Sequence, residues 1–332
     1  MKALVTGGGG FLGGAIVRAL LKNGDTVRSI QRGHYPELME LGVDAIQGDL
    51  CKADDIDAAV SGCDIVYHVA AMAGVWGDYE KYYQANVVAT QNVITACKEH
   101  NIHYLVYTST PSVVFDGASE EGIDESTPYS VNYFNAYQET KAEAEQLVLK
   151  TNDSKLKTVA LRPHLIWGPG DRHLAPRVIS RAQAGRLRLV GSKDHLVDSC
   201  YIDNAVAAHL LAADDLQNDA NCAGKAYFIS NDEPISMSEL INKILAAANL
   251  SPIQKRINEH LAYYIGAVFE RVYSIFRIEQ EPIMTRFVAK QLSTSHWFDL
   301  SAAKQDLSYE PKINIDEGMA RLKASFETET KQ

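Results

Sequence analysis

The sequence predicts an α/β protein built on a doubly wound parallel sheet, with a smaller and discontinuous C-terminal lobe. Two observations carry this prediction. An apolar strand pattern at 3–5 leads into a glycine cluster, Gly7 to Gly13, and then into a helix pattern at 14–21. Strand and helix patterns then alternate through the first half of the 332 residues. Such alternation places helices on both faces of a parallel sheet, which is the Rossmann fold.

The glycine cluster has the form of a loop that binds a dinucleotide. Gly7, Gly10 and Gly13 lie where the turn is tight and where a pyrophosphate must approach the backbone closely. The helix that follows directs its free N–H groups and its positive dipole end at the phosphates. A glycine triplet alone is weak evidence, but the strand before it and the helix after it supply the required context. The residues expected to contact the cofactor here are Gly7, Gly9, Gly10, Phe11, Leu12 and Gly13.

The remaining elements of the sheet follow in order along the chain. The expected strands are 26–30, 43–47, 64–69, 103–108 and 158–162, with 227–230 returning to the sheet. The expected helices are 54–60, 82–100 and 135–150. We therefore expect a nucleotide-binding domain at 1–165, to which 198–232 returns, and a substrate-binding lobe at 166–197 and 233–326.

The regular alternation fades after Pro163. Residues 187–190 and 198–202 are candidate short strands, and 236–248 is a candidate helix. Ser236 and Glu239 have the spacing of a capping box at the start of that helix. Residues 327–332 are expected to fray.

Composition limits the class of function. The net charge is −10 and the isoelectric point is about 5.5, which argues against nucleic acid as a partner. The five cysteines form no C-x-x-C pair, so we expect reduced thiols and neither a metal site nor a disulfide framework. The glycine loop begins at residue 7 with no signal peptide before it, so a cytoplasmic location is expected.

The segment 261–278, LAYYIGAVFERVYSIFRI, is crowded with aromatic and aliphatic residues. Only Glu270, Arg271 and Arg277 interrupt it. Two interpretations stay open. The segment is either a buried helix of the substrate lobe, or a helix that faces lipid or a partner enzyme beside an apolar substrate tunnel. No uncharged run reaches the length of a membrane span.

Tyr137 and Lys141 form a candidate catalytic pair. They are four residues apart on a predicted helix, so their side chains share one face. We expect the lysine ammonium group to favour the phenolate and to lower the pKa of Tyr137 from its ordinary value near 10. The pair can then exchange a proton with a substrate oxygen while hydride moves to or from a nicotinamide. The Y-x-x-x-K spacing is common by chance, and the dinucleotide loop upstream makes it informative.

With these residues the chain resembles an extended short-chain dehydrogenase/reductase over nearly its whole length. The matching pieces are 6–13, 48–50, His68-Val-Ala-Ala71, 86–92, Tyr107-Thr-Ser-Thr110, Tyr137 with Lys141, and Leu161-Arg-Pro163 running to Asp171. Within that family it resembles the 3β-hydroxysteroid and sterol-4-carboxylate 3-dehydrogenase branch. Two segments, 160–171 and 226–231, are similar to bacterial 2-alkyl-3-oxoalkanoate reductases of long-chain olefin biosynthesis, a branch of lipid metabolism.

The resemblance assigns further roles. Thr110 is the implied hydroxyl partner that bonds the substrate oxygen beside Tyr137, and Asn86 is implied to be structural. The family's dimer surface falls on 87–97 and 142–149, so a homodimer is implied. The further implied cofactor contacts are Asp49, Leu50, Val69, Ala70, Ala71, Thr108, Tyr137, Lys141, Pro163 and Ile166.

Three other residues are considered from their place in the sequence. His68 lies within an apolar strand, where a hydrogen-bonded core histidine is more common than a catalyst. His164 and Trp167 are candidates for lining the substrate pocket.

The second strand favours NADP(H) over NAD. NAD-binding proteins usually place an acidic residue at the end of this strand to hold the ribose hydroxyls. Here the sequence reads Arg28-Ser-Ile-Gln-Arg-Gly33, with no acid, and Arg32 could pair with a 2′-phosphate. Arg32 could instead stack on the adenine, which would serve either cofactor.

The predicted function is therefore interconversion of a 3-oxo and a 3-hydroxy group on a hydrophobic substrate, either a 2-alkyl-3-oxoalkanoic acid or a sterol. The alternative is a nucleotide-sugar epimerase of the same family. A dehydratase is disfavoured because Pro111-Ser112 follows Thr110, where those relatives carry an Asp-Glu pair. A cofactor sensor without catalysis is disfavoured because Tyr137 and Lys141 are both present.

Overall fold

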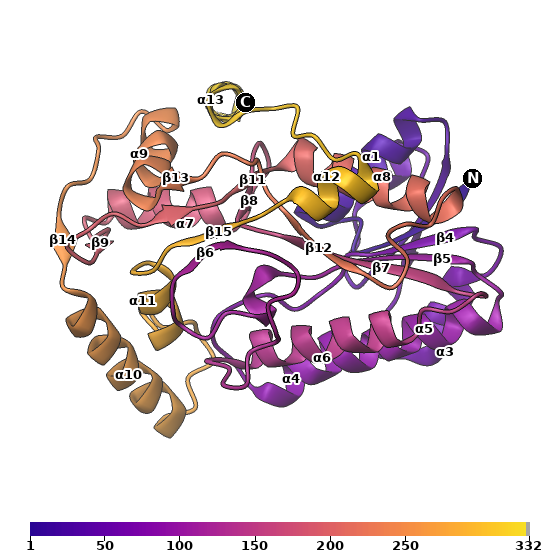
Figure 1. The fold of residues 1–332 in the computed structure, drawn as a ribbon, viewed down its shortest axis with the longest axis horizontal. Coiled ribbons are helices and arrows are strands. Elements are labelled where there is room, and N and C mark those ends of the chain that lie inside the picture. Colours follow the sequence, from indigo (N-terminus) through magenta and orange to yellow (C-terminus); the bar gives the residue numbers. More distant parts are fainter. Residues whose placement is uncertain (330–332) are drawn as a thin grey trace.

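Seven parallel strands form the central sheet in the order β12-β7-β5-β4-β1-β2-β3 in the computed structural model, which describes residues 1–329 (Figure 1). The strand order reverses between β1 and β4, so the ligand crevice of a doubly wound sheet lies at their carboxyl ends. The predicted fold class is confirmed. The strands are β1 Lys2–Thr6, β2 Thr26–Gln31, β3 Asp44–Gln47, β4 Ile65–His68, β5 Tyr104–Thr108, β7 Lys157–Pro163 and β12 Ala226–Ile229.

Helices cover both faces of this sheet. α1 and α8 pack together on one face, with α12 against α8, while α3, α5 and α6 pack on the other (Figure 1). Two separate apolar cores result, one under each helical layer. These helices are α1 Phe11–Lys22, α3 Ala53–Val60, α5 Ala89–Glu99, α6 Ala136–Lys150, α8 Ile202–Gln217 and α12 Ser301–Leu307.

A smaller part of the fold extends from the carboxyl ends of the strands. It contains a four-stranded sheet, β13-β10-β15-β6, and two two-stranded sheets, β11-β8 and β14-β9. These strands are β6 Glu120–Ile123, β8 Ile166–Trp167, β9 Leu189–Val190, β10 Leu196–Val197, β11 Cys200–Tyr201, β13 Ile235–Ser236, β14 Arg256–Ile257 and β15 His296–Phe298. The remaining helices are α2 Pro36–Glu40, α4 Tyr79–Tyr83, α7 Leu174–Gln183, α9 Met237–Ala247, α10 Glu259–Ile275, α11 Arg286–Gln291 and α13 Ile315–Glu329.

Several predicted elements have different bounds in the structure, and three of these differences change how the elements are described. The first helix begins at Phe11 and not at residue 14. The long helix expected at 82–100 is α4, then a π-helical turn η1 (Gln84–Val88), then α5. The strand expected at 198–202 is only β11, because the chain enters α8 at Ile202.

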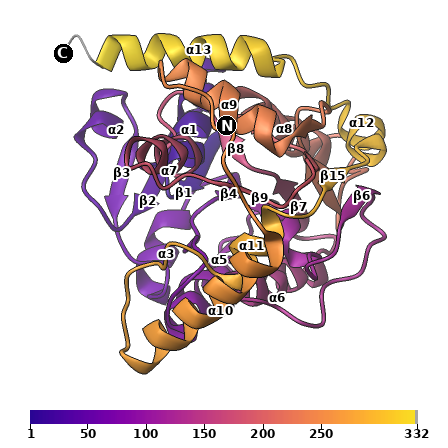
Figure 2. The ribbon, with the colours of Figure 1, turned by 90° about the vertical axis from the view of Figure 1, so that its left-hand side faces the viewer.

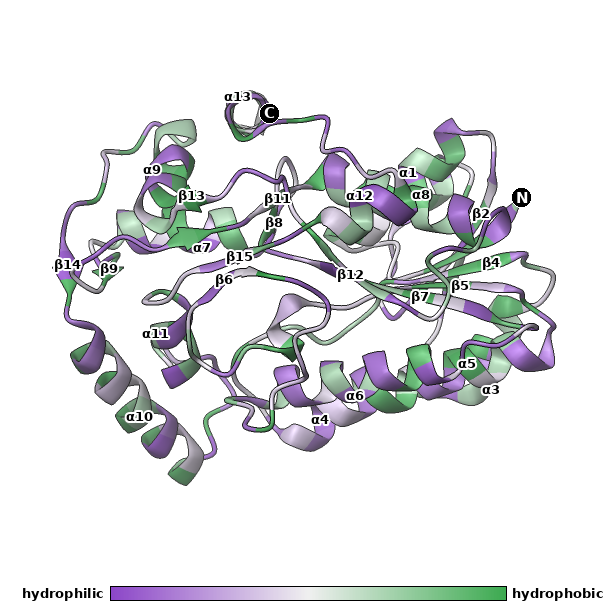
Figure 3. Cartoon of the chain, viewed as in Figure 1, coloured by the Kyte–Doolittle hydropathy of each residue, from purple (hydrophilic) through white to green (hydrophobic). Residues whose placement is uncertain are grey.

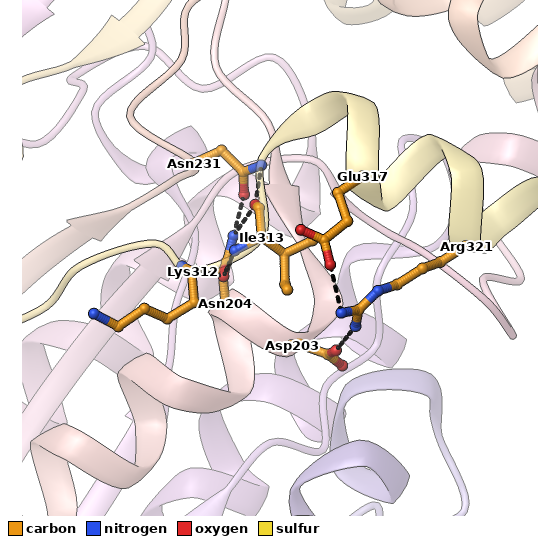
Figure 4. Close-up of polar contacts among 7 residues, drawn as sticks. All are labelled: Asp203, Asn204, Asn231, Lys312, Ile313, Glu317 and Arg321. Atoms are coloured by element: carbon orange, nitrogen blue, oxygen red, sulfur yellow. Dashed lines mark hydrogen bonds and ion pairs between the residues drawn. The ribbon is translucent and has the colours of Figure 1, made fainter.

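A buried asparagine on α8 holds the segment before the C-terminal helix α13, and α13 itself contacts α8 through the Asp203–Arg321 ion pair at 2.9 Å (Figure 4). Asn204 accepts hydrogen bonds from the backbone N–H groups of Lys312 (2.9 Å) and Ile313 (3.1 Å). Its amide donates to the Ile313 carbonyl at 2.7 Å and to Asn231 Oδ1 at 2.8 Å. Asn204 thereby ties the segment before α13 to both α8 and the loop after β12.

Helix α13 is regular to Glu329, so the expected fraying of 327–332 is wrong for residues 327–329, and 330–332 lie outside the described residues. Within residues 1–329, no helix is both long enough and apolar enough to cross a membrane. Helix α10 lies at the edge of the molecule against α11, with hydrophobic residues along its length (Figures 1 and 3).

Candidate active site

The loop between β1 and α1 can be built only with glycine at two positions. Gly7 has a left-handed φ of +73°, and a Cβ there would lie 3.2 Å from the Cα of Ala70. A Cβ on Gly13 would lie 2.3 Å from the Gly7 carbonyl oxygen, a distance that no real contact permits. A Cβ on Gly10 would meet only that same oxygen, at 3.1 Å, so the missing side chain leaves open the space in front of α1.

The N-terminus of α1 suits a phosphate group. The first-turn N–H groups belong to Phe11, Leu12 and Gly13, and such groups have no acceptor within their own helix. Gly10 provides no capping side chain, and the first turn carries no acidic residue. The positive end of the helix dipole is therefore unopposed, and a diphosphate fits this cradle.

A buried chain of hydrogen bonds joins the glycine loop to η1. The N–H groups of residues 69–70 both donate to Thr6 Oγ1 at 3.0 Å, and Thr6 Oγ1 lies 2.9 Å from His68 Nδ1. His68 Nε2 lies 2.9 Å from Thr90 Oγ1, which donates to the Asn86 carbonyl. Burial lowers the pKa of His68 to about 3, so the ring is neutral. The expectation of a hydrogen-bonded core histidine is confirmed.

Thr110 lies just beyond the end of β5, where the chain enters the short 3₁₀ turn η2 (Pro111–Val113). Its hydroxyl caps this turn, accepting from the Ser112 N–H at 3.3 Å and donating to Ser112 Oγ at 3.2 Å. Ser112 thus holds the Thr110 side chain in place. Thr110 is 8% exposed and in hydrogen-bonding contact with Tyr137.

Tyr137 is the second residue of α6, whose N-terminus is capped by Asn135 through a 2.9 Å bond to the Gln138 N–H. Burial raises the pKa of Tyr137, and the contact with Thr110 acts in the opposite direction. The expectation that Lys141 lowers the pKa of Tyr137 is wrong for the protein without a cofactor. The reason is that burial penalises the phenolate, whereas the lysine ammonium group is directed at a different acceptor. Tyr137 is therefore a protonated donor at neutral pH.

Lys141 is 2% exposed and lies one turn after Tyr137 on α6. Its Nζ donates to the Thr108 carbonyl oxygen at 2.7 Å and lies 4.2 Å from the centre of the Tyr107 ring. Burial lowers the pKa of Lys141 to about 7, and the carboxylate of Glu145 acts in the opposite direction. An ammonium group has three N–H donors, so two remain for hydroxyl groups of a bound ribose.

Two further contacts fix Thr108, which is the last residue of β5. Its Oγ1 lies 2.8 Å from His209 Nε2 on α8. His209 Nδ1 lies 2.7 Å from the Ala205 carbonyl, which only accepts, so Nε2 is the acceptor and Thr108 the donor. Thr108 was expected among the cofactor contacts, and its carbonyl and hydroxyl groups both bond to protein. The structure places Thr108 as the residue that positions Lys141.

Asn86 lies in η1 and joins two parts of the site. Its Oδ1 accepts from the Met72 N–H at 2.8 Å, and its Nδ2 donates to the Met72 carbonyl (3.1 Å) and to Thr140 Oγ1 (3.0 Å). Met72 lies in the loop after β4, and Thr140 precedes Lys141. π-Helical turns often occur at functional sites, and here the turn carries the asparagine that links this loop to α6.

Gln138 was not singled out from the sequence, yet it holds the two halves of the catalytic site together. The side chain is fully buried beside Tyr137. Its Nε2 donates to the carbonyl oxygens of Ser112 (3.0 Å) and Phe115 (3.1 Å), and its Oε1 accepts from the Phe134 N–H at 2.9 Å. The sequence feature that could have pointed to Gln138 is a polar residue on the inner face of the predicted helix, next to Tyr137.

The end of β2 carries no carboxylate. The side chain of Gln31 turns inward, where it accepts from Ser29 Oγ at 2.6 Å and donates to the Ile46 carbonyl at 3.3 Å. Arg32 follows with an exposed side chain. Hydrogen bonding from the Cys51 N–H lowers the pKa of Asp49, with a smaller contribution from the nearby Arg32 guanidinium.

The other expected cofactor residues line the same edge of the sheet. Leu50 is buried, and its carbonyl accepts from Asn92 at 2.9 Å. Ala71 is exposed in the loop after β4. Pro163 ends β7 and Ile166 begins β8, and between them Leu165 has a φ of +41°. This left-handed leucine makes the sharp turn between the two strands, and such strain is concentrated at functional sites.

Trp167 does not line a pocket. It is fully buried, its indole N–H donates to Ser199 at 3.0 Å, and its ring packs against Tyr201, so that expectation is wrong. His164 is also buried, with Nε2 2.9 Å from Nδ1 of His296 on β15. A cavity of about 510 Å³ lies elsewhere, lined by Tyr129, Arg162, Asp306 and their neighbours, and includes none of the three catalytic candidates.

The chain is similar to named reductases and dehydrogenases over nearly its whole length. The model of the 3-beta hydroxysteroid dehydrogenase/isomerase family matches residues 4–257. A 2-alkyl-3-oxoalkanoate reductase of Shewanella oneidensis is 55% identical, over 98% of this chain and 86% of the relative. A protein of the same name from Stenotrophomonas maltophilia is 52% identical, over 98% and 99%. The decarboxylating sterol-4-alpha-carboxylate 3-dehydrogenase of Mus musculus is 34% identical, over 98% and 91%.

Solved structures with the same fold include sugar-nucleotide epimerases. The UDP-glucuronic acid 4-epimerase of Bacillus cereus, solved with NAD, has a TM-score of 0.77 and 23% identity, covering 99% of both chains. The UDP-glucose 4-epimerase of Thermotoga maritima has a TM-score of 0.77 and 18% identity, covering 99% of this chain and 100% of the other. At such identities the likeness indicates the fold and not the reaction.

Proposed function

The chain belongs to the 3-beta hydroxysteroid dehydrogenase/isomerase family, and we propose that it uses NADP(H) to interconvert a 3-oxo and a 3-hydroxy group on a 2-alkyl-3-oxoalkanoic acid or a similar hydrophobic substrate. The resemblance seen in the sequence is confirmed by the family match and by relatives named as reductases and dehydrogenases. The chain is thus an oxidoreductase that acts on CH–OH groups. The substrate class rests on the two 2-alkyl-3-oxoalkanoate reductases.

One observation carries the reaction type, namely the arrangement of Thr110, Tyr137 and Lys141. A protonated tyrosine in contact with Thr110 can donate to a carbonyl oxygen, and both hydroxyl groups can hold that oxygen. The buried ammonium group of Lys141 lies one helical turn away, fixed on Thr108. This arrangement can supply a proton to a carbonyl oxygen or accept one from a hydroxyl group.

The bound nicotinamide dinucleotide would supply or accept the hydride. The glycine loop and the first turn of α1 would hold its diphosphate, and Lys141 would bond its ribose. In the reducing direction Tyr137 donates its proton to the 3-oxo oxygen as that oxygen gains negative charge. Thr110 would turn its single hydroxyl hydrogen from Ser112 Oγ to the same oxygen, donate a second hydrogen bond and fix its position. In the oxidising direction Tyr137 accepts the proton of the 3-hydroxy group.

An apolar substrate is supported by the side chains near Thr110 and Tyr137. Phe115 follows η2, Phe134 precedes α6, and Phe287 lies on α11. The ring of Phe115 lies 6.2 Å from that of Phe134 and 5.9 Å from that of Phe287. An aromatic cluster therefore borders the loops that carry the catalytic groups, and alkyl chains suit such surroundings better than a nucleotide does.

The preference for NADP(H) is supported by the end of β2. Gln31 is turned inward and offers no carboxylate to the ribose hydroxyls, while Arg32 is exposed directly after it. A guanidinium group binds a 2′-phosphate through paired, charge-assisted hydrogen bonds. A carboxylate in the same place would repel that phosphate.

The alternative function, nucleotide-sugar epimerisation, is supported only by the solved structures of epimerases. Substrate class can be tested in the oxidising direction, because 3-oxo acids lose carbon dioxide spontaneously whereas the 3-hydroxy acids are stable. Purified protein is incubated with NADP⁺ and, separately, a 2-alkyl-3-hydroxyalkanoic acid, a 3β-hydroxysteroid and UDP-glucose, and formation of the reduced cofactor is followed. UDP-glucose is also examined by chromatography for epimerised product. Turnover of the hydroxy acid is expected, and turnover of the sugar alone would contradict the proposal.

We also propose a homodimer through α5 and α6. These two helices pack side by side on one outer face of the sheet (Figure 1). Light scattering of the purified protein should give twice the mass of one chain, and a monomer would contradict the proposal.

A further inference from the structure

Helix α10 presents one apolar face to solvent. Its other face packs on α11 through Ala262 and Gly266, and a Cβ on Gly266 would lie 2.5 Å from the backbone of Thr285. The expectation of a buried helix is therefore wrong for most of its surface. We define the α10 outer face as Leu261 (52% exposed), Tyr264 (68%), Val268 (60%), Val272 (38%) and Ile275 (65%), continued by Phe276 (72%). The three- and four-residue spacing makes a single stripe along the helix.

The charges around this stripe favour an anionic surface. The acidic residues of α10, Glu259 and Glu270, lie about 160–180° around the helix from the stripe residue Leu261, at about 100° per residue. Glu270 is moreover paired with Arg286 at 2.6 Å. Arg271 and Arg277 flank the stripe, and their exposed side chains make no hydrogen bond or ion pair with residues 1–329. The stripe is thus cationic and apolar on a chain whose net charge is −10.

The acidic residues just after α10 are also neutralised by pairing. Glu279 bonds Lys81 at 2.6 Å, and Glu281 bonds Arg177 at 3.0 Å. Both contacts are internal to the protein, so these carboxylates are held by cations, whereas the Arg277 side chain has no such partner in the described part of the chain. Charge is therefore distributed in a way that lowers repulsion from a negatively charged surface on this side.

The helix is suited to lie along a surface and not to cross a bilayer. Its 17 residues span about 25 Å at 1.5 Å per residue, and within residues 1–329 no helix has the properties of a membrane span. An apolar stripe flanked by arginines, with aromatic rings at Tyr264 and Phe276, is typical of helices that bind at the lipid interface. Helix α10 projects at one edge of the molecule, away from the central sheet (Figures 1 and 2).

The end of α10 is attached to the catalytic side of the fold. The indole N–H of Trp76 donates to the Ile278 carbonyl at 2.9 Å. Trp76 belongs to the loop after β4, and Asn86 fixes the start of that loop at Met72. A surface docked on α10 would therefore lie beside the edge of the sheet where the catalytic residues are placed.

We propose that the α10 outer face docks onto the surface of an anionic phospholipid bilayer. The argument depends on exposure and charge, and it does not require the proposed substrate. If that substrate is a long-chain acid, docking would place the active-site edge next to the bilayer that dissolves it, a consequence that rests on the proposed function.

The test is co-sedimentation of the full-length protein with vesicles, without cofactor or substrate. One vesicle population contains phosphatidylcholine alone, and the other contains phosphatidylcholine with phosphatidylglycerol. We expect binding to the anionic vesicles that weakens as salt is raised, and little binding to the neutral ones. Quenching of Trp76 fluorescence by brominated lipids provides a second readout, and Trp76→Phe should remove most of that quenching.

Two variants and a matched control distinguish the proposed contact from nonspecific adsorption to vesicles. Val268→Asp with Ile275→Asp places carboxylates on the stripe, and we expect binding to anionic vesicles to fall by about tenfold or more. Arg271→Ala with Arg277→Ala should reduce the preference for anionic lipid. Met39→Asp changes a similarly exposed apolar residue (58%) on α2 and should leave binding unchanged. Thermal unfolding of each variant confirms that it is folded.

Some outcomes would overturn the proposal. They are absence of vesicle binding by the unmodified protein, equal binding to neutral vesicles, and full binding by the Val268→Asp, Ile275→Asp variant. If the unmodified protein ignores vesicles and this variant instead loses a self-association seen by light scattering, the stripe is a contact between copies of the chain. Because no substrate is present, failure here leaves the proposed oxidoreductase activity untouched, and loss of that activity leaves vesicle binding untouched.

Discussion

The ammonium group of Lys141 donates a 2.7 Å hydrogen bond to the carbonyl oxygen of Thr108, the last residue of β5. The hydroxyl group of the same threonine is held by His209 on α8. The position of Lys141 therefore depends both on strand β5 and on helix α8. The two residues that link them, Thr108 and His209, are 101 positions apart in the sequence. Neither contact is visible in the Tyr137/Lys141 spacing that first pointed to the pair.

The burial of Lys141 predicts a pH-dependent contribution to stability. The pKa of Lys141 is lowered from 10.5 to about 7 in the folded protein. Below about pH 7 the burial penalty is fully present, because the amine is charged in both states. Between about pH 7 and 10.5 the unfolded chain binds the proton and the folded protein does not, so stability attributable to Lys141 rises with pH.

Urea unfolding of the unmodified protein and of Lys141→Met checks this prediction. The free energy of unfolding of the unmodified protein, minus that of the variant, should increase between about pH 7 and about pH 10. A difference that stays constant over this range would show that the lysine keeps its ordinary pKa in the fold.

Gln138 is predicted to act as a positioning residue for the catalytic hydroxyl groups. Gln138→Leu keeps the side-chain volume but leaves the carbonyl groups of Ser112 and Phe115 without their donor. We expect a loss of about 2–4 kcal/mol in the free energy of unfolding. We also expect kcat to fall about tenfold to a hundredfold because the Thr110 loop shifts.

The matched control is Gln305→Leu, an exposed glutamine on α12 and away from the proposed dimer helices, which should alter neither quantity. Cofactor affinity of Gln138→Leu, measured by fluorescence titration, should stay near that of the unmodified protein. A variant that loses stability while keeping full kcat would restrict Gln138 to a structural role.

Arg32 is predicted to select the cofactor. Arg32→Ala should weaken NADPH binding by about tenfold or more, because charge-assisted hydrogen bonds to the 2′-phosphate are lost. NADH has no such phosphate, so its Kd should change little. Lys22→Ala, at the far end of α1, serves as the control for loss of one positive charge. Equal effects on the two cofactors would indicate that Arg32 stacks on the adenine.

Asn204 is predicted to hold the C-terminal helix α13 on the fold (Figure 4). Asn204→Leu removes four hydrogen bonds, to Lys312, Ile313 and Asn231. Since buried backbone groups are left unpaired, we expect a loss of about 3 kcal/mol or more in the free energy of unfolding. Asn218→Leu, an exposed asparagine just after α8, should have a small effect in the same urea titration. Equal losses of unfolding free energy in the two variants would show that Asn204 stabilises the fold no more than an exposed asparagine does.

The parts of the fold that could be predicted from the sequence are those with a local signature. The glycine loop follows from the steric needs of a tight turn, and Tyr137 with Lys141 follows from the spacing of a helix. Helix α8 was not predicted, because its buried face is built largely from small residues such as Ala205, Ala208 and Ala212, which give a weak periodic signal. As a result, the strand expected at 198–202 included Ile202, which is the first residue of α8.

The rest of the site depends on tertiary contacts that no local pattern reveals. Gln138 and His209 act through partners distant in sequence, and the π-helical turn around Asn86 interrupts what reads as one continuous helix. The pKa of Tyr137 was expected to fall from its proximity to Lys141, but burial raises it. The apolar segment at 261–278 was compatible with a buried helix, and only packing shows how much of it faces solvent.

The central claim, proton transfer by Tyr137 to or from a 3-oxygen, is tested most directly by one substitution. Tyr137→Phe is compared with the unmodified protein for NADP⁺-dependent oxidation of a 2-alkyl-3-hydroxyalkanoic acid, with Tyr104→Phe at the other end of β5 as control. We predict that kcat of Tyr137→Phe falls by about two to four orders of magnitude, with cofactor affinity retained. Full turnover by Tyr137→Phe would contradict this account.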